Sequence, residues 1–213
     1  MVADMAADCV IGVDLGGTKV LAGAVDAEHQ VHHRAHRTVL GLEQASLLEA
    51  IADAVEEVRA AAPNAPDAAG FGIPSLIDQE HGTAVMSVNL PIADMPFRDV
   101  MSERLDLPVF MDNDGNVAAL AEHRYGAARG AHTSLMITVG TGIGGGLILD
   151  DEVFRGATAR APSSATWSST RTARAARATA PTAAVWRRSR PAPRSCGRPR
   201  SWRPTVPGRR SRR

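Results

Sequence analysis

The chain has 213 residues, enough for one large domain or two small ones, so a single minimal motif is excluded. With 44% hydrophobic residues, 22% charged residues and a formal net charge of +1, its overall composition is typical of a soluble protein. The net charge is close to zero because an acidic segment and a basic segment offset each other. Residues 1–156 carry 23 acidic and 9 basic side chains, whereas residues 157–213 carry 15 Arg and no acidic residue.

Residues 157–213 form a low-complexity tail. They contain no Ile, Leu, Met or Phe, and 49 of the 57 are Ala, Arg, Ser, Thr or Pro. Such a segment buries too little apolar surface to offset the entropy lost on ordering it. The composition therefore predicts a disordered basic tail behind a folded part that ends near residue 156.

The cysteines and the N-terminal residues indicate the cellular compartment of the protein. Cys9 and Cys196 are the only cysteines, one in each segment, which does not suggest a disulfide framework. The first eight residues are acidic and lack the basic flank and apolar core of a signal peptide, and no apolar run approaches the length of a membrane span. These features predict a cytoplasmic protein that does not associate with a membrane.

Hydrophobic periodicity predicts alternating strands and helices up to about residue 149. The predicted strands are Cys9–Val13, Val20–Val25, Val31–Leu40, Ala68–Ile73, Leu107–Met111, Leu135–Val139 and Gly146–Leu149. The predicted helices span Leu47 to Ala61, a short segment after Pro96, and Gly115 to about Tyr125. This alternation is typical of an α/β architecture, in which ligands bind at the loops that follow the carboxyl ends of strands.

The first candidate site is the turn Asp14-Leu15-Gly16-Gly17-Thr18-Lys19, between two predicted strands. Gly16 and Gly17 let backbone N–H groups come close to an anion such as phosphate, while Thr18 and Lys19 add a hydroxyl donor and a cation. Asp14 could hold Mg²⁺ through its water shell. A plain hairpin with a Gly-Gly turn would explain the same residues, and both interpretations remain open.

The second candidate is a run with five glycines in seven residues, from residue 140 to residue 146. Its candidate phosphate-binding residues are Gly140, Thr141, Gly142, Gly144 and Gly145. A hairpin needs one or two glycines, so five suggest that something comes close to the main chain. The run fits neither the Walker A pattern nor the dinucleotide fingerprint, and flexibility alone remains an alternative.

The third candidate is Asn113-Asp114, at the junction of a predicted strand and a predicted helix. Asp114 could accept the proton of a substrate hydroxyl while Asn113 binds a neighbouring hydroxyl. Asp and Asn are also favoured helix N-caps, and considered alone the capping interpretation is the stronger. Two glycine turns with a carboxylate between them nevertheless supply what phosphoryl transfer needs, namely an anion cradle, a metal site and a base.

Together these motifs resemble those of the ROK family of sugar kinases, and most of all its bacterial glucokinases. The matching segments, in order from about Val10 to Gly156, are Asp14–Lys19, Gly72-Ile73-Pro74, Asn89-Leu90-Pro91, Asn113-Asp114-Gly115-Asn116 with Glu122, and Gly140–Gly146. The resemblance implies an actin-like ATPase (ribonuclease H-like) fold of two α/β domains that close on sugar and ATP. Residues 1–125 would form the first domain and residues 126–156 the start of the second, which remains incomplete.

The resemblance also implies an activity, the Mg²⁺- and ATP-dependent phosphorylation of a hexose, with glucose converted to glucose 6-phosphate as the first expectation. Asp114 would be the base for the 6-hydroxyl group, Asn113 and Asn89 would contact the sugar, and the two glycine turns would hold the ATP phosphates. An intact protein could form a homodimer. Mannose, fructose or an N-acetylated sugar as substrate, and polyphosphate as donor, remain open.

The chain departs from the family after residue 157, where a Gly-Glu-Leu-Gly-His segment and a cysteine-rich zinc site are missing. A shifted reading frame from Ala161 onward permits Ala-Glu-Leu-Gly-His-Met-Val, and the same shift between Thr172 and Arg188 permits a three-cysteine peptide similar to the zinc segment. We therefore interpret the tail as the product of a frameshift at or just after Thr158. The chain as translated has no zinc ligands of this kind, and we expect it to have little kinase activity.

Two other functions are weaker interpretations. Fifteen Arg without an acidic residue would attract nucleic acid, but an out-of-frame GC-rich gene gives the same composition, so a nucleic-acid partner is disfavoured. The ROK family also includes sugar-binding repressors, which carry a helix-turn-helix region before the sugar domain. Only eight residues precede the first predicted strand, so a regulator is the lesser expectation.

Overall fold

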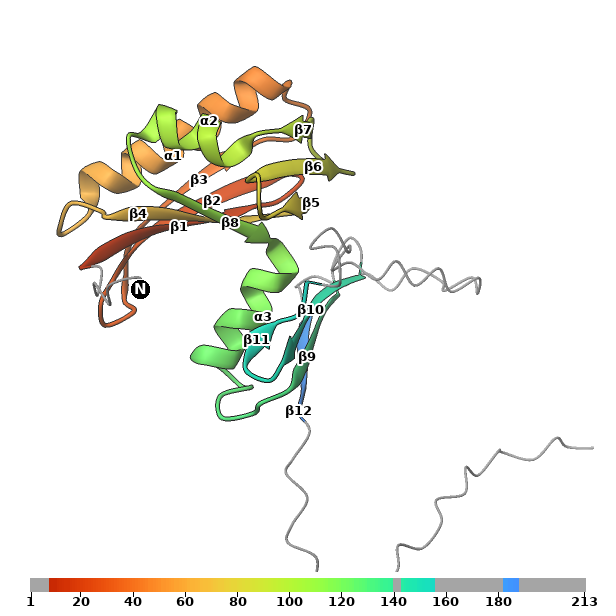
Figure 1. Ribbon diagram of the computed structural model, residues 1–213. Coiled ribbons are helices and arrows are strands. Elements are labelled where there is room, and N and C mark those ends of the chain that lie inside the picture. The colour runs from red at the N-terminus through yellow and green to blue at the C-terminus, as the bar shows by residue number, and fades with distance from the viewer. Residues whose placement is uncertain (1–7, 140–142, 156–181, 188–213) are drawn as a thin grey trace, which may run out of the picture.

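A five-stranded mixed sheet is the centre of the first lobe, in a computed structural model that describes residues 8–139, 143–155 and 182–187 (Figure 1). Its strand order is β3-β2-β1-β4-β8. The strands are β1 (Cys9–Leu15), β2 (Lys19–Asp26), β3 (Val31–Thr38), β4 (Ala68–Ile73) and β8 (Val109–Asn113). β1 pairs antiparallel with β2 but parallel with β4, and β4 pairs parallel with β8. The carboxyl ends of β1, β4 and β8 therefore meet at one edge of the sheet.

Two helices cover one face of this sheet, α1 (Gln44–Ala61) and α2 (Phe97–Leu105) (Figure 1). The apolar positions of α1 recur at helical spacing, so its buried side chains form one stripe. These side chains are Leu47, Leu48, Ile51, Ala54, Val55 and Val58. Phe97 of α2 meets Phe71 of β4 edge to face, with ring centroids 5.3 Å apart. This packing fixes the sheet whose edge carries the candidate site.

The chain between β4 and α2 forms a small three-stranded antiparallel sheet. This sheet was not predicted from the sequence. It consists of β5 (Ser75–Asp78), β6 (Thr83–Ser87) and β7 (Ala93–Met95). Each strand has only three to five residues, too few for a clear alternating pattern. The turn before β6 contains Gly82, whose φ of +64° lies in the left-handed region that favours glycine.

α3 (Asp114–Arg124) follows β8 directly and connects the first sheet to a second one (Figure 1). α3 packs on an antiparallel sheet of order β11-β10-β9-β12. Its strands are β9 (Ser134–Val139), β10 (Ile143–Leu149), β11 (Glu152–Val153) and β12 (Thr182–Arg187). The alternating α/β architecture predicted from the sequence is thus confirmed.

Strand β12 lies within the tail for which no regular structure was predicted. It pairs antiparallel with β9, from Thr182 opposite Val139 to Arg187 opposite Ser134. Its sequence, Thr-Ala-Ala-Val-Trp-Arg, contains residues with high strand propensity, and β9 offers a free edge beside it. Residue 156 and the remaining tail residues, 157–181 and 188–213, lie outside the described residues.

The predicted elements match the observed ones to within a few residues. The third strand ends at Thr38 instead of Leu40, and the last helix runs from Asp114 to Arg124 instead of from Gly115 to about Tyr125. In the part of the chain that the structure describes, no helix is both long and apolar enough to cross a membrane.

Candidate active site

Two carboxylates meet where β1 and β8 end. Asp14 lies opposite Gly72 in the β1–β4 ladder, and a Cβ placed on Gly72 would lie 3.5 Å from the Cα of Asp114. The pKa of the Asp14 carboxyl is raised, first by partial desolvation and then by the negative charge of Asp114, while Lys19 acts in the opposite direction. The structure therefore brings the predicted base and the predicted magnesium-binding residue together.

The first glycine turn lies beside this pair. Its backbone is closed by a 2.8 Å hydrogen bond from Gly16 N to Lys19 O, and Val39 N donates to Thr18 O at 3.0 Å. A Cβ on Gly17 would lie only 2.7 Å from the Cβ of Asn89, so no side chain fits at this position without displacing Asn89. The turn that was predicted to bind phosphate thus contacts Asn89, which was predicted to bind the sugar.

Asn113 is the N-cap of α3, as the capping interpretation predicted. Its Oδ1 accepts a 2.9 Å hydrogen bond from Gly115 N, and its Nδ2 donates to the carbonyl oxygen of Ser75 at 3.2 Å and to that of Ile73 at 3.5 Å. These bonds anchor the first turn of α3 to the strands before it. A sugar contact by Asn113, which stays a prediction, would have to be made in addition to this role.

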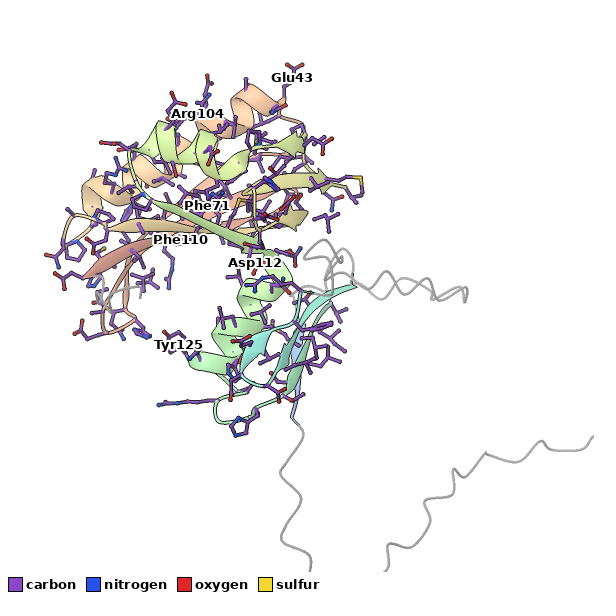
Figure 2. The ribbon with its side chains drawn as sticks, in the orientation of Figure 1. Glu43, Phe71, Arg104, Phe110, Asp112 and Tyr125 are labelled. Carbon is purple, nitrogen blue, oxygen red and sulfur yellow. The ribbon has the colours of Figure 1, made fainter. Side chains whose placement is uncertain are left out.

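Asp112 and Arg155 were not singled out in the sequence, yet they are central to this region. Asp112, labelled in Figure 2 where β8 passes into α3, accepts hydrogen bonds from both Nε and Nη2 of Arg155 and from Asn116 Nδ2. Its position at a strand end, next to Asn113 and Asp114, was a signal that could have been used for Asp112. The sequence carried no such signal for Arg155, because their pairing spans 43 residues.

The second glycine run is described only from residue 143 onward, so the predicted phosphate-binding residues Gly140, Thr141 and Gly142 lie outside the described residues. Gly145 and Gly146 are buried in β10 against α3. A Cβ on Gly115 would lie 2.5 Å from Gly145 O, and one on Gly146 would lie 2.6 Å from Gly115 O. The glycine run suggested that something comes close to the main chain. At its carboxyl end, the element that comes close is α3. Phosphate binding by Gly144 and Gly145 stays a prediction.

The acidic pair fits a magnesium ion better than a structural transition metal. Mg²⁺ usually keeps several waters and takes one or two carboxylates, and a cation between Asp14 and Asp114 would offset the repulsion that raises the pKa of Asp14. Among the described residues, no group of three or more His, Cys, Asp or Glu side chains is arranged to hold a metal ion.

Comparison with known proteins identifies the family of this chain. The ROK family model matches residues 10–163. A glucokinase from Streptomyces coelicolor is 34% identical over 146 residues, which cover 68% of this chain and 45% of that protein. A xylose repressor from Caldicellulosiruptor bescii is 31% identical over 157 residues, which cover 70% of this chain and 38% of that protein.

Two solved structures show the same fold. A ROK glucokinase from Streptomyces griseus, in complex with glucose and AMPPNP, has a TM-score of 0.67 at 33% identity and covers 73% of this chain. A ROK hexokinase from Thermus thermophilus has a TM-score of 0.64 at 38% identity and also covers 73%. Only 49% and 51% of those two chains are matched, so this chain spans about half their length. The actin-like fold is confirmed for the part of the chain that the structure describes.

Proposed function

Because this chain belongs to the ROK family, we propose that it contains the catalytic half of an ATP-dependent hexose kinase, with glucose as the preferred substrate. The observation that carries the proposal is the meeting of Asp14, Asp114 and the first glycine turn at one edge of the sheet. A carboxylate base, an acidic metal-binding position and an anion-binding turn are the parts that phosphoryl transfer uses.

Asp114 is the base in this proposal. Its side chain is exposed at the first turn of α3, where it can reach a substrate hydroxyl. Asp114 accepts the hydroxyl proton as the sugar oxygen attacks the γ-phosphorus of ATP, and the bond from phosphorus to the bridging oxygen of ADP breaks. Asp14 would hold Mg²⁺ through water, and the ion would neutralise charge on the phosphates. The N–H groups of Gly16 and Gly17, together with Lys19, would hold phosphate oxygens, and Asn89 would bind the sugar.

The similarity to a xylose repressor favours a second candidate, a sugar-binding regulator without kinase activity. A regulator needs the sugar contacts but has no use for an acidic pair next to an anion-binding turn. The raised pKa of Asp14 beside Asp114 therefore favours the kinase.

The activity of the whole protein depends on the half that this chain does not share with its relatives. We propose that the reading frame changes at or just after Thr158, so that the chain keeps Asp114 and the first glycine turn but lacks most of the second domain. Without that domain, the site cannot close over the sugar and exclude water. Sequencing the DNA around the Thr158 codon tests the frameshift, and codons incompatible with a shifted Glu-Leu-Gly-His peptide would reject it.

A coupled ADP-release assay with a panel of hexoses tests the function. The chain and a version with the restored frame are assayed side by side, and Asp114→Asn in the restored version is the control. We expect the restored protein to phosphorylate glucose, the control to lose at least about a thousandfold in kcat, and the present chain to show little activity. A restored protein that phosphorylates no hexose but still binds one would favour the regulator.

A further inference from the structure

We propose that Arg155 is a positioning residue for Asp114, and that it acts through the carboxylate of Asp112. The inference rests on the proposed kinase function, because it concerns how the base of that reaction is held. Figure 2 shows Asp112 where β8 passes into α3, two residues before Asp114. Arg155 follows β11, at the edge of the other sheet.

The Asp112 carboxylate is held by four hydrogen bonds, two on each oxygen. Oδ2 accepts from Arg155 Nε at 2.9 Å and from Arg155 Nη2 at 2.7 Å. Oδ1 accepts from the backbone N of Asn113 at 2.7 Å and from Asn116 Nδ2 at 2.9 Å. Because both oxygens are occupied, Asp112 is suited to organising its neighbours and not to binding substrate or accepting a proton.

The hydrogen bonds continue from Asp112 to the residues on both sides of Asp114. Asp112 fixes the backbone of Asn113, and the side chain of Asn113 accepts from Gly115 N at 2.9 Å. On the other side, Asp112 holds the buried Asn116, one turn into the helix. Asp114 lies between these fixed points, and its own Oδ1 accepts from Gly115 N at 2.9 Å, so the direction of its side chain depends on how this turn is held. A base must lie within a few tenths of an ångström of its productive position, so this control matters for the rate.

Burial explains why Asp112 needs Arg155. The side chain of Asp112 is 13% exposed and that of Arg155 is 38% exposed, so the carboxylate has little access to water and the guanidinium is its cationic partner. If the guanidinium were removed, a largely buried charge would lose its partner, and the turn would shift to hydrate it. The pair also joins the end of β8 in the first sheet to the segment after β11 in the second sheet, so a relative movement of the two sheets would displace Asp114.

The first test measures hydrogen exchange in the present chain and does not need activity. Arg155→Gln is expected to speed exchange of the Asn113 and Gly115 amides by about tenfold, while α1 amides stay unchanged. The matched control is Arg37→Gln, which breaks a 2.7 Å pair with Glu57 at an arginine of similar exposure, 33%. Equal exchange at Asn113 and Gly115 in both variants would overturn the proposal.

The second test uses the version with the restored frame and separates kcat from KM. Arg155→Gln is expected to lower kcat by about ten- to a hundredfold while KM for the hexose changes by less than about threefold, because the base is misplaced and the sugar contacts remain. Arg155→Lys, which keeps the charge, should retain the fold and recover part of kcat. Adding Asp112→Asn to Arg155→Gln should also recover part, since no unpaired charge then remains. An unchanged kcat in Arg155→Gln would overturn the proposal.

The two tests separate this inference from the proposed function. If the restored protein without substitutions phosphorylates no hexose, the kinase proposal fails, and the exchange rates still decide whether Arg155 orders the turn that carries Asp114. If the restored protein is active and Arg155→Gln affects neither exchange nor kcat, the kinase proposal stands and the positioning role is rejected.

Discussion

Asp114, the first residue of α3, lies close enough to Asp14 at the end of β1 for its negative charge to raise the pKa of the Asp14 carboxyl. Partial desolvation of Asp14 is a larger cause, and Lys19 offsets only part of the effect. Two carboxylates held near one another oppose folding at neutral pH, and such arrangements cluster at functional sites. The pair is therefore expected to lower the stability of the fold at neutral pH.

Replacing Asp14 by Asn is expected to stabilise the fold at pH 7. The folded pKa of Asp14 lies above the ordinary value of 3.8, so between the two values the folded state binds more protons than the unfolded state. The free energy of unfolding therefore falls as pH rises through this window, and Asp14→Asn removes that fall. We expect the thermal midpoint at pH 7 to rise by about 2–4 °C.

Unfolding melts between pH 3 and pH 8 measure this effect. Asp53→Asn, on the exposed face of α1, is the matched control and should leave the thermal midpoint at pH 7 unchanged. A thermal midpoint for Asp14→Asn that falls at pH 7 would contradict the assignment of Asp14 to a strained acidic pair.

Gly145 is expected to tolerate no side chain. A Cβ there would lie 2.2 Å from the carbonyl oxygen of Met136, on the neighbouring strand β9, so the strands would have to separate. We expect Gly145→Ala to lower the free energy of unfolding by about 2 kcal/mol or more, because overpacking of a tight interior strains the backbone. Urea titration measures the change.

Gly70→Ala is the control for Gly145→Ala. Gly70 also lies in a strand, but no atom comes within 4 Å of the Cβ that the substitution adds. We expect a change of less than about 0.5 kcal/mol for this variant. If both variants were destabilised equally, strand propensity, and not the close packing around Gly145, would explain the effect of Gly145→Ala.

Asn113 is expected to contribute to stability as a cap, whatever it binds. Asn113→Ala removes one of the two side-chain acceptors of Gly115 N, the other being Asp114 Oδ1, and also the donor to Ser75 O, and we expect a loss of about 1–2 kcal/mol. Asn113→Ser keeps a good capping oxygen but cannot reach Ser75, so it should cost less. Urea unfolding ranks the two variants. The capping role would be rejected if both were as stable as the parent chain.

The main elements of the fold could be predicted because their residues satisfy local rules. The apolar stripe from Leu47 to Val58 specifies α1, and Pro63 follows its end; the apolar runs at β1, β4 and β8 specify buried strands. β5, β6 and β7 escaped prediction because they are short and depend on pairing with each other. β12 escaped because the composition of the tail as a whole concealed a six-residue segment that contains Thr182, Val185 and Trp186, residue types with strand propensity.

Most residues of the candidate site could be predicted from the sequence, but the contacts that hold them could not. The motifs indicated Asp14, Asp114 and the first glycine turn, because together they supply the carboxylates and the anion-binding turn that phosphoryl transfer needs. The partners of Asp112 could not be found, since Arg155 is brought to it only by the packing of α3 on the second sheet. The glycines near residue 145 were interpreted through ligand chemistry, while the structure shows that α3 already fills the space beside Gly145 and Gly146.

Gly17 and Asn89 offer a way to test whether the phosphate turn and the sugar contact form one site. A Cβ on Gly17 would lie 2.7 Å from the Cβ of Asn89, so Gly17→Ala must displace Asn89 or the turn itself. In the present chain we expect a loss of about 1–3 kcal/mol in the free energy of unfolding, and Asn89→Gly in the same chain should recover most of it by removing the clashing atom.

In the version with the restored frame, Gly17→Ala should raise KM for both ATP and the hexose by about tenfold, because both binding elements move. The double variant with Asn89→Gly should recover KM for ATP but not KM for the hexose, since the turn relaxes while the sugar contact is gone. Asn89→Gly alone is the control and should affect only the hexose. If it raised KM for ATP as strongly as Gly17→Ala does, Asn89 would belong to the nucleotide site instead of the sugar site.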